Sequence, residues 1–272
     1  MPRLAVIVFA LVLASTGANA APYDNAFAAY QKGDYAAALK LMKPLAEQGN
    51  VNAQYNVGAM YNEALGVTTD YTEAAKWFKK AAAQGNVYAE VDLGMLNEYG
   101  RGIQKDYKEA LRLFRLAADK KNPTAELNIG SMYERGLGVP QDYKTAAAWY
   151  RKAADQGDAG AQLNLGALYY AGQGVPKDPK QALKWMRMAA QQGNGRAQFD
   201  LATLYTNGEG IPQDLPRALV WFNAAAVTLA GNEAKTADEN SKAVAAKMTR
   251  DQLLAAQDMA RKCRVGDFKN CG

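Results

Sequence analysis

The stretch that decides the fold runs from Ala161 to Asn194 and reads AQLNLGALYYAGQGVPKDPKQALKWMRMAAQQGN. Its pattern returns every 36 residues without an insertion. The clearest columns are an alanine, an aspartate, a second alanine and a tryptophan: Ala53, Ala89, Ala125, Ala161, Ala197; Asp70, Asp106, Asp142, Asp178, Asp214; Ala74, Ala110, Ala146, Ala182, Ala218; and Trp77, Trp149, Trp185, Trp221, with Leu113 in the second unit. Such a period predicts a solenoid or a propeller, and the content of each unit decides which.

Each unit contains two helices. The first segment of the unit at 125–158 places Ala125, Ile129 and Met132 at the spacing of one helix face. Gly136 and Gly138 follow, and a glycine just past the last periodic residue can end a helix in the left-handed conformation.

A second helix follows the loop in the same unit. Asp142 is expected to cap it, because its carboxylate can accept the free amide groups of the first turn. The helix then presents Ala146, Trp149 and Ala153 on one side and ends near Gly157. The repeat is therefore a helical hairpin, and the expected fold class is all-α.

A small residue stands in the middle of each first helix. The column reads Gly58, Gly94, Gly130, Gly166 and then Ala202. Each glycine costs about 1 kcal/mol of helix stability relative to alanine. A cost repeated in this way predicts that the partner helix approaches closely, and we expect the aromatic column of the second helices to fill the space between neighbouring units.

The full pattern is A-x-x-x-L-G-x-x-Y-x-x-G-x-G-V-P-x-D-x-x-x-A-x-x-W-[FY]-x-x-A-A-x-x-G-[ND], and it resembles the Sel1-like repeat family, relatives of the tetratricopeptide repeat. The resemblance covers five repeats over residues 53–232 and implies a right-handed α-solenoid. Single units depart from the pattern at Ala64 and Lys121 (for glycine), Asn97 (for tyrosine) and Leu113 (for tryptophan). We expect none of these departures to prevent folding.

Both ends of the array are expected to be atypical, since a terminal repeat meets water on one side. Residues 21–52 resemble a degenerate tetratricopeptide-like helix pair that caps the N-terminus. Residues 233–272 continue as capping helices, in which Thr249 and Gln252 form a capping box. The apolar side of the last helix is predicted to be Leu253, Ala256 and Ala260. No stretch has the composition of a flexible linker, so one domain is expected.

Residues 1–20 have the features of a signal peptide. Arg3 precedes an apolar run, and small residues lead to a predicted cleavage site between Ala20 and Ala21. An uncleaved anchor is disfavoured because the run is shorter than the ~20 residues that cross a bilayer, and no other stretch is suited to spanning a membrane. By resemblance to a family common in Gram-negative bacteria, the periplasm is the expected location, with release outside the cell as the alternative.

The two cysteines, Cys263 and Cys271, lie in the C-terminal tail. In an exported protein they predict a structural disulfide. A redox or metal-binding pair is the alternative, but the spacing is not C-x-x-C and the sequence contains no histidine to complete a ligand set.

Several function classes lack support in the sequence. Without histidine there is no Ser-His-Asp or Cys-His arrangement. The G-x-G loops lack the remainder of a dinucleotide or P-loop motif and are interpreted as helix punctuation. The net charge is +5, but the lysines and arginines are scattered over the second helices among acidic residues. This distribution favours a solvated face over nucleic-acid binding. We therefore expect no enzyme activity, cofactor or metal.

By resemblance to tetratricopeptide stacks, the first helices line a concave face on which a partner lies. One candidate set is a ladder of amide or carboxylate residues: Asn56, Asp92, Asn128, Asn164 and Asp200. These side chains either contact a bound peptide backbone or hydrogen-bond between adjacent units. The second interpretation is favoured, because packing positions repeat unchanged and recognition positions seldom do.

The other candidate set varies from unit to unit near the ends of the first helices: Asn62, Glu63, Glu98, Tyr99, Glu134, Arg135, Tyr170 and Thr206. Such differences can encode a specific partner, and Tyr99 and Tyr170 are expected to be exposed interface anchors. The alternative is a polar surface without a binding role.

The expected function is a non-catalytic adaptor or regulator of the bacterial envelope that binds another envelope protein or an extended peptide. A carbohydrate- or peptidoglycan-binding module, with Tyr99 and Tyr170 as stacking platforms, is the first alternative. A β-lactamase-like hydrolase is the second, but the relatives described in that way carry a cysteine pair in each repeat and this chain does not.

Overall fold

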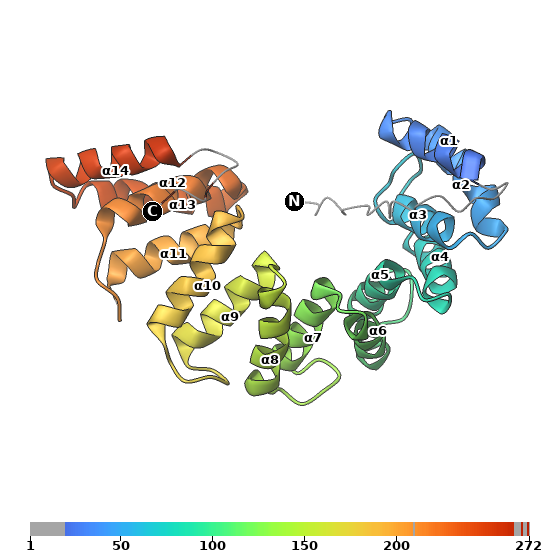
Figure 1. Ribbon diagram of the computed structural model, residues 1–272, viewed down its shortest axis with the longest axis horizontal. Helices are drawn as coiled ribbons and strands as arrows, with labels where there is room; N and C mark the ends of the chain where they lie inside the picture. Colours follow the sequence, from blue (N-terminus) through green and yellow to red (C-terminus); the bar gives the residue numbers. More distant parts are fainter. Residues whose placement is uncertain (1–19, 209, 264–267, 269–270, 272) are drawn as a thin grey trace. The chain divides into compact units, whose positions relative to one another are not determined.

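The computed structural model describes residues 20–208, 210–263, 268 and 271. Within them the chain forms fourteen α-helices and no β-strand (Figure 1), so the predicted all-α fold of helical hairpins is confirmed. The predicted signal peptide lies outside the described residues, except that the backbone of Ala20 begins the first helix.

The helices follow one another as antiparallel pairs. Their bounds are α1 (Ala20–Gln31), α2 (Tyr35–Glu47), α3 (Val51–Asn62), α4 (Tyr71–Ala83), α5 (Val87–Tyr99), α6 (Tyr107–Asp119), α7 (Pro123–Arg135), α8 (Tyr143–Asp155), α9 (Ala159–Ala171), α10 (Pro179–Gln191), α11 (Gly195–Asn207), α12 (Leu215–Thr228), α13 (Gly231–Ala245) and α14 (Arg250–Lys262). Odd-numbered helices up to α11 are the first helices of their hairpins, and their even-numbered partners are the second helices.

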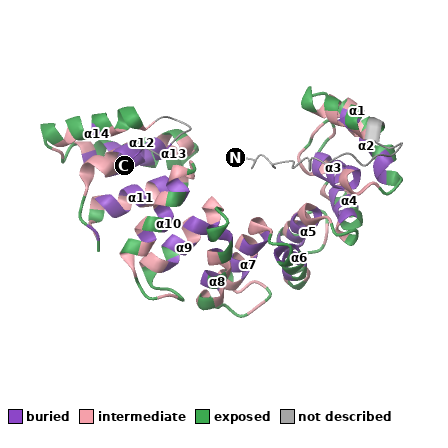
Figure 2. Cartoon of the chain, viewed as in Figure 1, coloured by how far each residue is buried: buried purple, intermediate pink, exposed green. Residues whose placement is uncertain are grey.

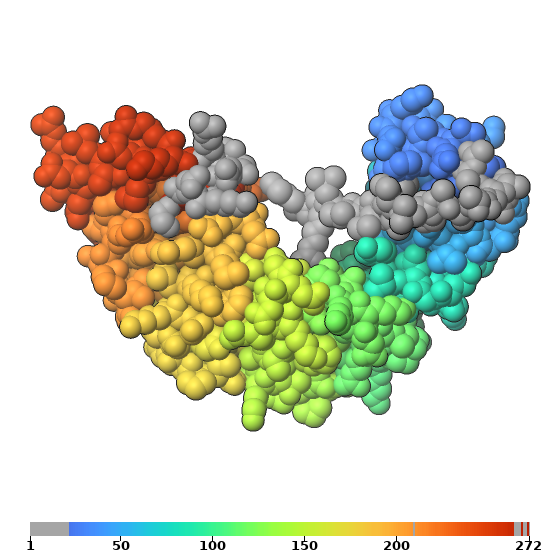
Figure 3. Space-filling model, viewed as in Figure 1, coloured from blue at the N-terminus to red at the C-terminus, as the bar shows by residue number. Residues whose placement is uncertain are grey.

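The chain divides into two compact units. The N-terminal unit contains residues up to 125 together with 137–139, and the C-terminal unit contains 126–136 and the residues from 140 onward. Within each unit, hairpins pack against their neighbours in chain order, and α14 packs on α12 at the end of the C-terminal unit (Figures 1 and 3). Buried residues line the helix sides that face these neighbours (Figure 2).

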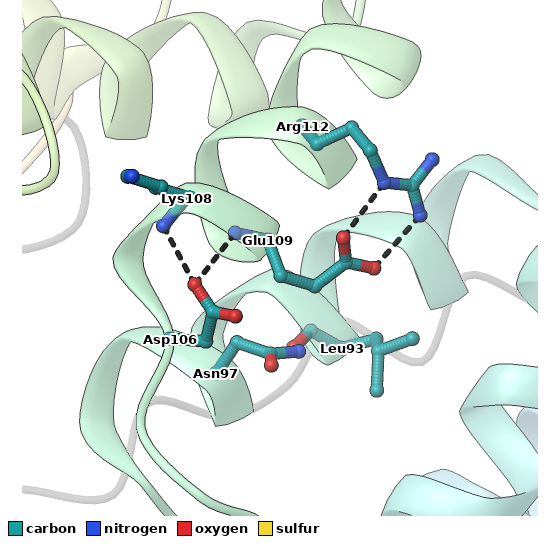
Figure 4. Close-up of polar contacts among 6 residues, drawn as sticks. All are labelled: Leu93, Asn97, Asp106, Lys108, Glu109 and Arg112. Atoms are coloured by element: carbon teal, nitrogen blue, oxygen red, sulfur yellow. Dashed lines mark hydrogen bonds and ion pairs between the residues drawn. The ribbon is translucent and has the colours of Figure 1, made fainter.

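Aspartates begin the second helices, as predicted. The carboxylate of Asp106 accepts hydrogen bonds from the backbone amides of Lys108 and Glu109 at 2.9 and 3.0 Å (Figure 4). The backbone amide of Asp106 donates to the carbonyl of Asn97 at 3.0 Å, which ties the loop to the preceding helix. The same capping recurs at Asp70, Asp142, Asp178 and Asp214.

The predicted close approach at the central glycines is confirmed. A Cβ atom added to Gly94 would lie 2.6 Å from Cε1 of Phe114, well inside van der Waals contact. The corresponding pairs are Gly58 with Phe78, Gly130 with Tyr150, and Gly166 with Met186. In each pair the bulky residue comes directly after the residue of the tryptophan column. This residue, and not the tryptophan, therefore packs against the central glycine of the first helix.

The tryptophan column is buried in most of the repeats. Trp77, Trp185 and Trp221 are at most 5% exposed, whereas Trp149 is only partly buried. Among the residues that the structure describes, the indole N–H groups of the three buried tryptophans have no hydrogen-bond partner. Apolar packing and cation–π contacts, such as that of Arg151 with Trp185, account for their contribution.

The second glycine of each G-x-G loop has a packing role in addition to ending a helix. A Cβ atom on Gly102 would lie 2.2 Å from the carbonyl carbon of Tyr71, at the start of the second helix of the preceding hairpin. Gly174 approaches Tyr143 in the same way. The interpretation of these loops as helix punctuation was therefore incomplete: only glycine permits this contact between hairpins.

The C-terminal end of the chain follows the prediction with one correction. The capping box of Thr249 and Gln252 is present, and Ala256 is buried. Ala260, predicted on the apolar side, is exposed; Met259 instead packs on the core, because α14 meets the rest of the unit along one narrow stripe.

The predicted disulfide between Cys263 and Cys271 is present. Cys271 is fully buried, and Phe268 is 5% exposed. A Cβ atom on Gly193 would contact the ring of Phe268, so this ring lies on the turn between α10 and α11.

Candidate binding face

The first-helix face is formed in the N-terminal unit by α1, α3 and α5, and the polar ladder connects these helices. The side-chain amide of Asn56 in α3 donates to the hydroxyl of Tyr23 in α1 at 2.7 Å. Asp92 in α5 hydrogen-bonds to Tyr55 in α3. Each ladder residue in this unit therefore binds a tyrosine of the preceding hairpin.

Asp92 has an unusual protonation equilibrium. Burial raises the pKa of its carboxyl group to about 7, the hydrogen bond from Tyr55 opposes this rise, and the charge of Glu63 adds to it. This carboxyl group therefore titrates in the neutral pH range, and its protonated form carries no charge. It then resembles the asparagines that hold the same place in other repeats.

The ladder is less uniform in the C-terminal unit. Asn164 hydrogen-bonds to Tyr150 of the preceding hairpin. Asp200 accepts from Arg196 of its own helix at 3.1 Å. The side-chain nitrogen of Asn128 is buried and has no hydrogen-bond partner in the part of the chain that the structure describes. Contacts between adjacent hairpins thus occur at some ladder positions, while contact with a bound peptide remains a prediction for all of them.

The variable positions divide into exposed and buried residues. Tyr99 is 52% exposed, as expected for an interface anchor, and Arg135 is also exposed. Tyr170 was expected to be exposed but is partly buried against the core of the C-terminal unit. Glu98 is only 6% exposed. Sequence variation alone therefore did not separate surface from core at these helix ends.

The remaining variable residues are partly buried and form local hydrogen bonds. Asn62 donates to Glu63 at 2.6 Å, and Thr206 donates to the carbonyl of Ala202 at 2.8 Å. The carboxylate of Glu134 accepts from the hydroxyl of Tyr150. Of these bonds, only that between Tyr150 and Glu134 joins the two helices of a hairpin.

A second polar column, which the sequence reasoning missed, lies inside the hairpins. It consists of Gln54, Glu90, Glu126, Gln162 and Gln198, all at most 5% exposed. Each side chain meets the end of its partner helix: Glu90 pairs with Lys120 at 2.6 Å, and Gln198 accepts from Thr228 at 2.6 Å. The signal was a glutamine or glutamate directly after the first alanine of every repeat.

The described residues contain no group of three metal-ligating side chains that could hold an ion. Among them there is also no helix that combines the length and apolar character of a bilayer span.

Stacked helical hairpins with a polar, tyrosine-bearing face define the class of α-solenoid binding proteins. The Sel1 repeat model matches residues 27–50, 51–86, 87–122, 123–158, 159–194 and 195–226, and the chain belongs to this family. Sel1 repeat solenoids are typical protein-interaction modules and typically non-catalytic. The match includes residues 27–50, whose turn and second helix also resemble the tetratricopeptide version of the repeat.

Solved structures agree with the family assignment. The chain is similar to a Sel1 repeat protein from Oxalobacter formigenes, with 34% identity over 89% of this chain and 100% of that chain, and a TM-score of 0.75. A putative Sel1 repeat protein from Klebsiella pneumoniae subsp. pneumoniae is 24% identical over 75% of this chain and 97% of that chain, with a TM-score of 0.50. Comparison with curated protein sequences gave no match.

Proposed function

We propose that this protein is a non-catalytic adaptor that binds another protein of the bacterial envelope on its first-helix face. The observation that carries the proposal is the exposed ring of Tyr99 at the end of α5, on a fold whose other large aromatic residues mostly stabilise the stack. The guanidinium group of Arg101 lies 5.3 Å from this ring, so the tyrosine is held at the surface by a neighbour.

An envelope location is part of the proposal. It is supported by the signal-peptide features of residues 1–20 and by the disulfide, because disulfides persist in oxidising compartments. The periplasm is the proposed compartment, with secretion as the alternative.

The test is affinity capture from an envelope extract with residues 21–272, followed by mass spectrometry and reconstitution with the purified partner. We expect Tyr99→Ala to weaken the reconstituted complex by about tenfold, the effect of removing an interface anchor. The matched control is Leu116→Ala, which truncates an exposed apolar residue on the second helix α6. Equal weakening by both variants, or no partner that can be reconstituted, would contradict the proposal.

A carbohydrate-binding role is the second candidate, since an exposed tyrosine such as Tyr99 is also a suitable stacking platform for a sugar ring. Pull-down with isolated peptidoglycan in the absence of other proteins distinguishes the two. Retention that Tyr99→Ala abolishes would favour the glycan, and lack of retention would favour the protein partner.

A further inference from the structure

Positive charge is strongly partitioned between the two helix layers of the N-terminal unit. The first helices α1, α3 and α5 contain no lysine or arginine, whereas the second helices α2, α4 and α6 contain eight. The first layer and the residues that directly follow its helices carry five carboxylates, Asp24, Glu63, Glu90, Asp92 and Glu98, against one lysine, Lys32 after α1. A chain of net charge +5 therefore has a locally acidic face.

Three of these carboxylates are placed to meet a ligand. Glu90 is already paired with Lys120, and Glu98 is buried. Asp24 is exposed on α1, and Glu63 is partly exposed at the end of α3. Asp92, on α5, is partly exposed and hydrogen-bonded to Tyr55 of α3.

Tyrosines lie near these carboxylates: Asp24 is close to Tyr23, and Asp92 and Glu63 are close to Tyr55. The rings of Tyr55 and Tyr88 lie 5.8 Å apart, and Tyr23 reaches Asn56 from α1. Burial raises the pKa of Tyr30 in α1, and the neighbouring Tyr35 and Glu63 raise it further. The charge of Glu63 therefore influences Tyr30 in α1 as well as Asp92 in α5. Aromatic faces beside carboxylates are a favourable environment for ammonium and guanidinium groups.

A buried acceptor on the same face lacks a donor. Asn56 is 3% exposed, and its amide nitrogen is held by Tyr23, but its side-chain oxygen has no hydrogen-bond partner among the described residues. An unpaired buried acceptor is costly, and a ligand N–H group is one way to satisfy it. This observation is independent of the charges and favours the same kind of ligand: one rich in hydrogen-bond donors.

We propose that the face formed by α1, α3 and α5 binds an extended, lysine- or arginine-rich segment of a partner protein. The inference rests on the proposed adaptor function and specifies the chemistry of the partner. Cationic side chains of that segment lie against Tyr23 and Tyr88 and pair with Glu63 and Asp92, since complementary charge selects partners and speeds their encounter. In the C-terminal unit the first helices carry Arg135 and Arg196, so the preference belongs to the N-terminal unit.

The test is fluorescence anisotropy with three labelled twelve-residue peptides, of alternating Lys-Ala, Glu-Ala and Ser-Ala sequence, added to residues 21–272. We expect binding of the Lys-Ala peptide only, weakened at least about threefold by added salt because screening acts on partly exposed pairs. The double variant Glu63→Gln/Asp92→Asn should weaken this binding by about tenfold.

The matched control is Glu73→Gln/Glu109→Gln, which removes two carboxylates from the second-helix layer and should leave binding unchanged. Circular dichroism establishes that each variant is folded. Binding of the Glu-Ala peptide, no binding of any peptide, or equal weakening by the control would overturn the cationic-segment proposal. None of these results alters the capture experiment, whose dependence on Tyr99 decides the adaptor function separately.

Discussion

Two residues, Ala64 and Lys121, occupy left-handed backbone where most of the other repeats have glycine. Their φ angles are 58° and 60°. For a residue with a Cβ atom, this conformation destabilises the folded state by roughly 1 kcal/mol. We expect Ala64→Gly and Lys121→Gly each to raise the free energy of unfolding by about 0.5 kcal/mol or more in urea titrations.

The control for these substitutions is Ala148→Gly, at an exposed position inside α8. It should lower the free energy of unfolding by about 1 kcal/mol, because glycine is a poor residue in a helix interior. Destabilisation by all three changes would contradict the assignment of strain to Ala64 and Lys121.

The central glycines give the opposite prediction. Alanine is normally the better helix residue, but a methyl group on Gly94 would overlap the ring of Phe114. We expect Gly94→Ala to lower the free energy of unfolding by about 1 to 3 kcal/mol, the usual cost of overpacking a core. In a Phe114→Ala background the same change should cost little, and an equal cost in both backgrounds, measured by urea unfolding, would refute the steric explanation.

Asp92 predicts a pH-dependent stability. Its folded pKa of about 7 lies above the unfolded value of about 3.9, so the folded state binds the proton more tightly and the free energy of unfolding falls as pH rises from about 4 to 7. The upper limit of this loss is about 4 kcal/mol, and structural relaxation reduces it. We therefore expect the change in the free energy of unfolding caused by Asp92→Asn to be more favourable at pH 8 than at pH 5, by about 1 kcal/mol or more. Thermal unfolding of variant and wild type in matched buffers measures this change. The same change at both pH values would contradict the assignment.

Single residues also show the limit of sequence reasoning. Tyr99 and Tyr170 stand at neighbouring places in the repeat, yet one is exposed and the other packs against the core. The variation between repeats predicted that these positions differ, but burial depends on neighbours outside the hairpin. The buried column of Gln54 and its equivalents was missed because polar side chains are usually exposed, whereas these are buried between helices.

At the scale of helices and loops, the sequence was more informative. Asparagine or aspartate caps and loop glycines placed most helix ends, because these residues satisfy backbone groups locally. The contact of Gly102 with the preceding hairpin could not be predicted in this way, since it depends on how two hairpins stack. Likewise the apolar stripe of α14 was only partly predicted, because one narrow contact decides which side is covered.

The C-terminal disulfide is expected to stabilise the last helix more than the repeats. Closing a loop between Cys263 and Cys271 restricts the unfolded chain, and its loss should cost roughly 2 to 3 kcal/mol in the chain-entropy model. We expect Cys263→Ala/Cys271→Ala to accelerate tryptic cleavage after Arg261 and Lys262 while leaving the helix content of the repeats unchanged. Reducing agent should reproduce the effect in the wild type and add nothing in the variant; unchanged cleavage would show that the tail is held without the bond.

At the scale of the whole molecule, the same residue types recur in every hairpin and give its two helices different roles. Second helices carry the tryptophans and many more basic residues than the first helices, while first helices carry the polar ladder and the exposed tyrosine. The repeat pattern sufficed to predict the hairpins and their stacking columns, because every unit repeats the same packing solution. The acidic character of the N-terminal first-helix face was not predicted, since it appears only when residues are sorted by helix layer.

The central claim is that partners bind the first-helix face, and hydrogen–deuterium exchange of the reconstituted complex tests it most directly. Amides in α1, α3 and α5 should exchange more slowly when the partner is bound, while those in α2, α4 and α6 keep their rates. Protection confined to the second helices, or absent from the N-terminal unit, would contradict the account.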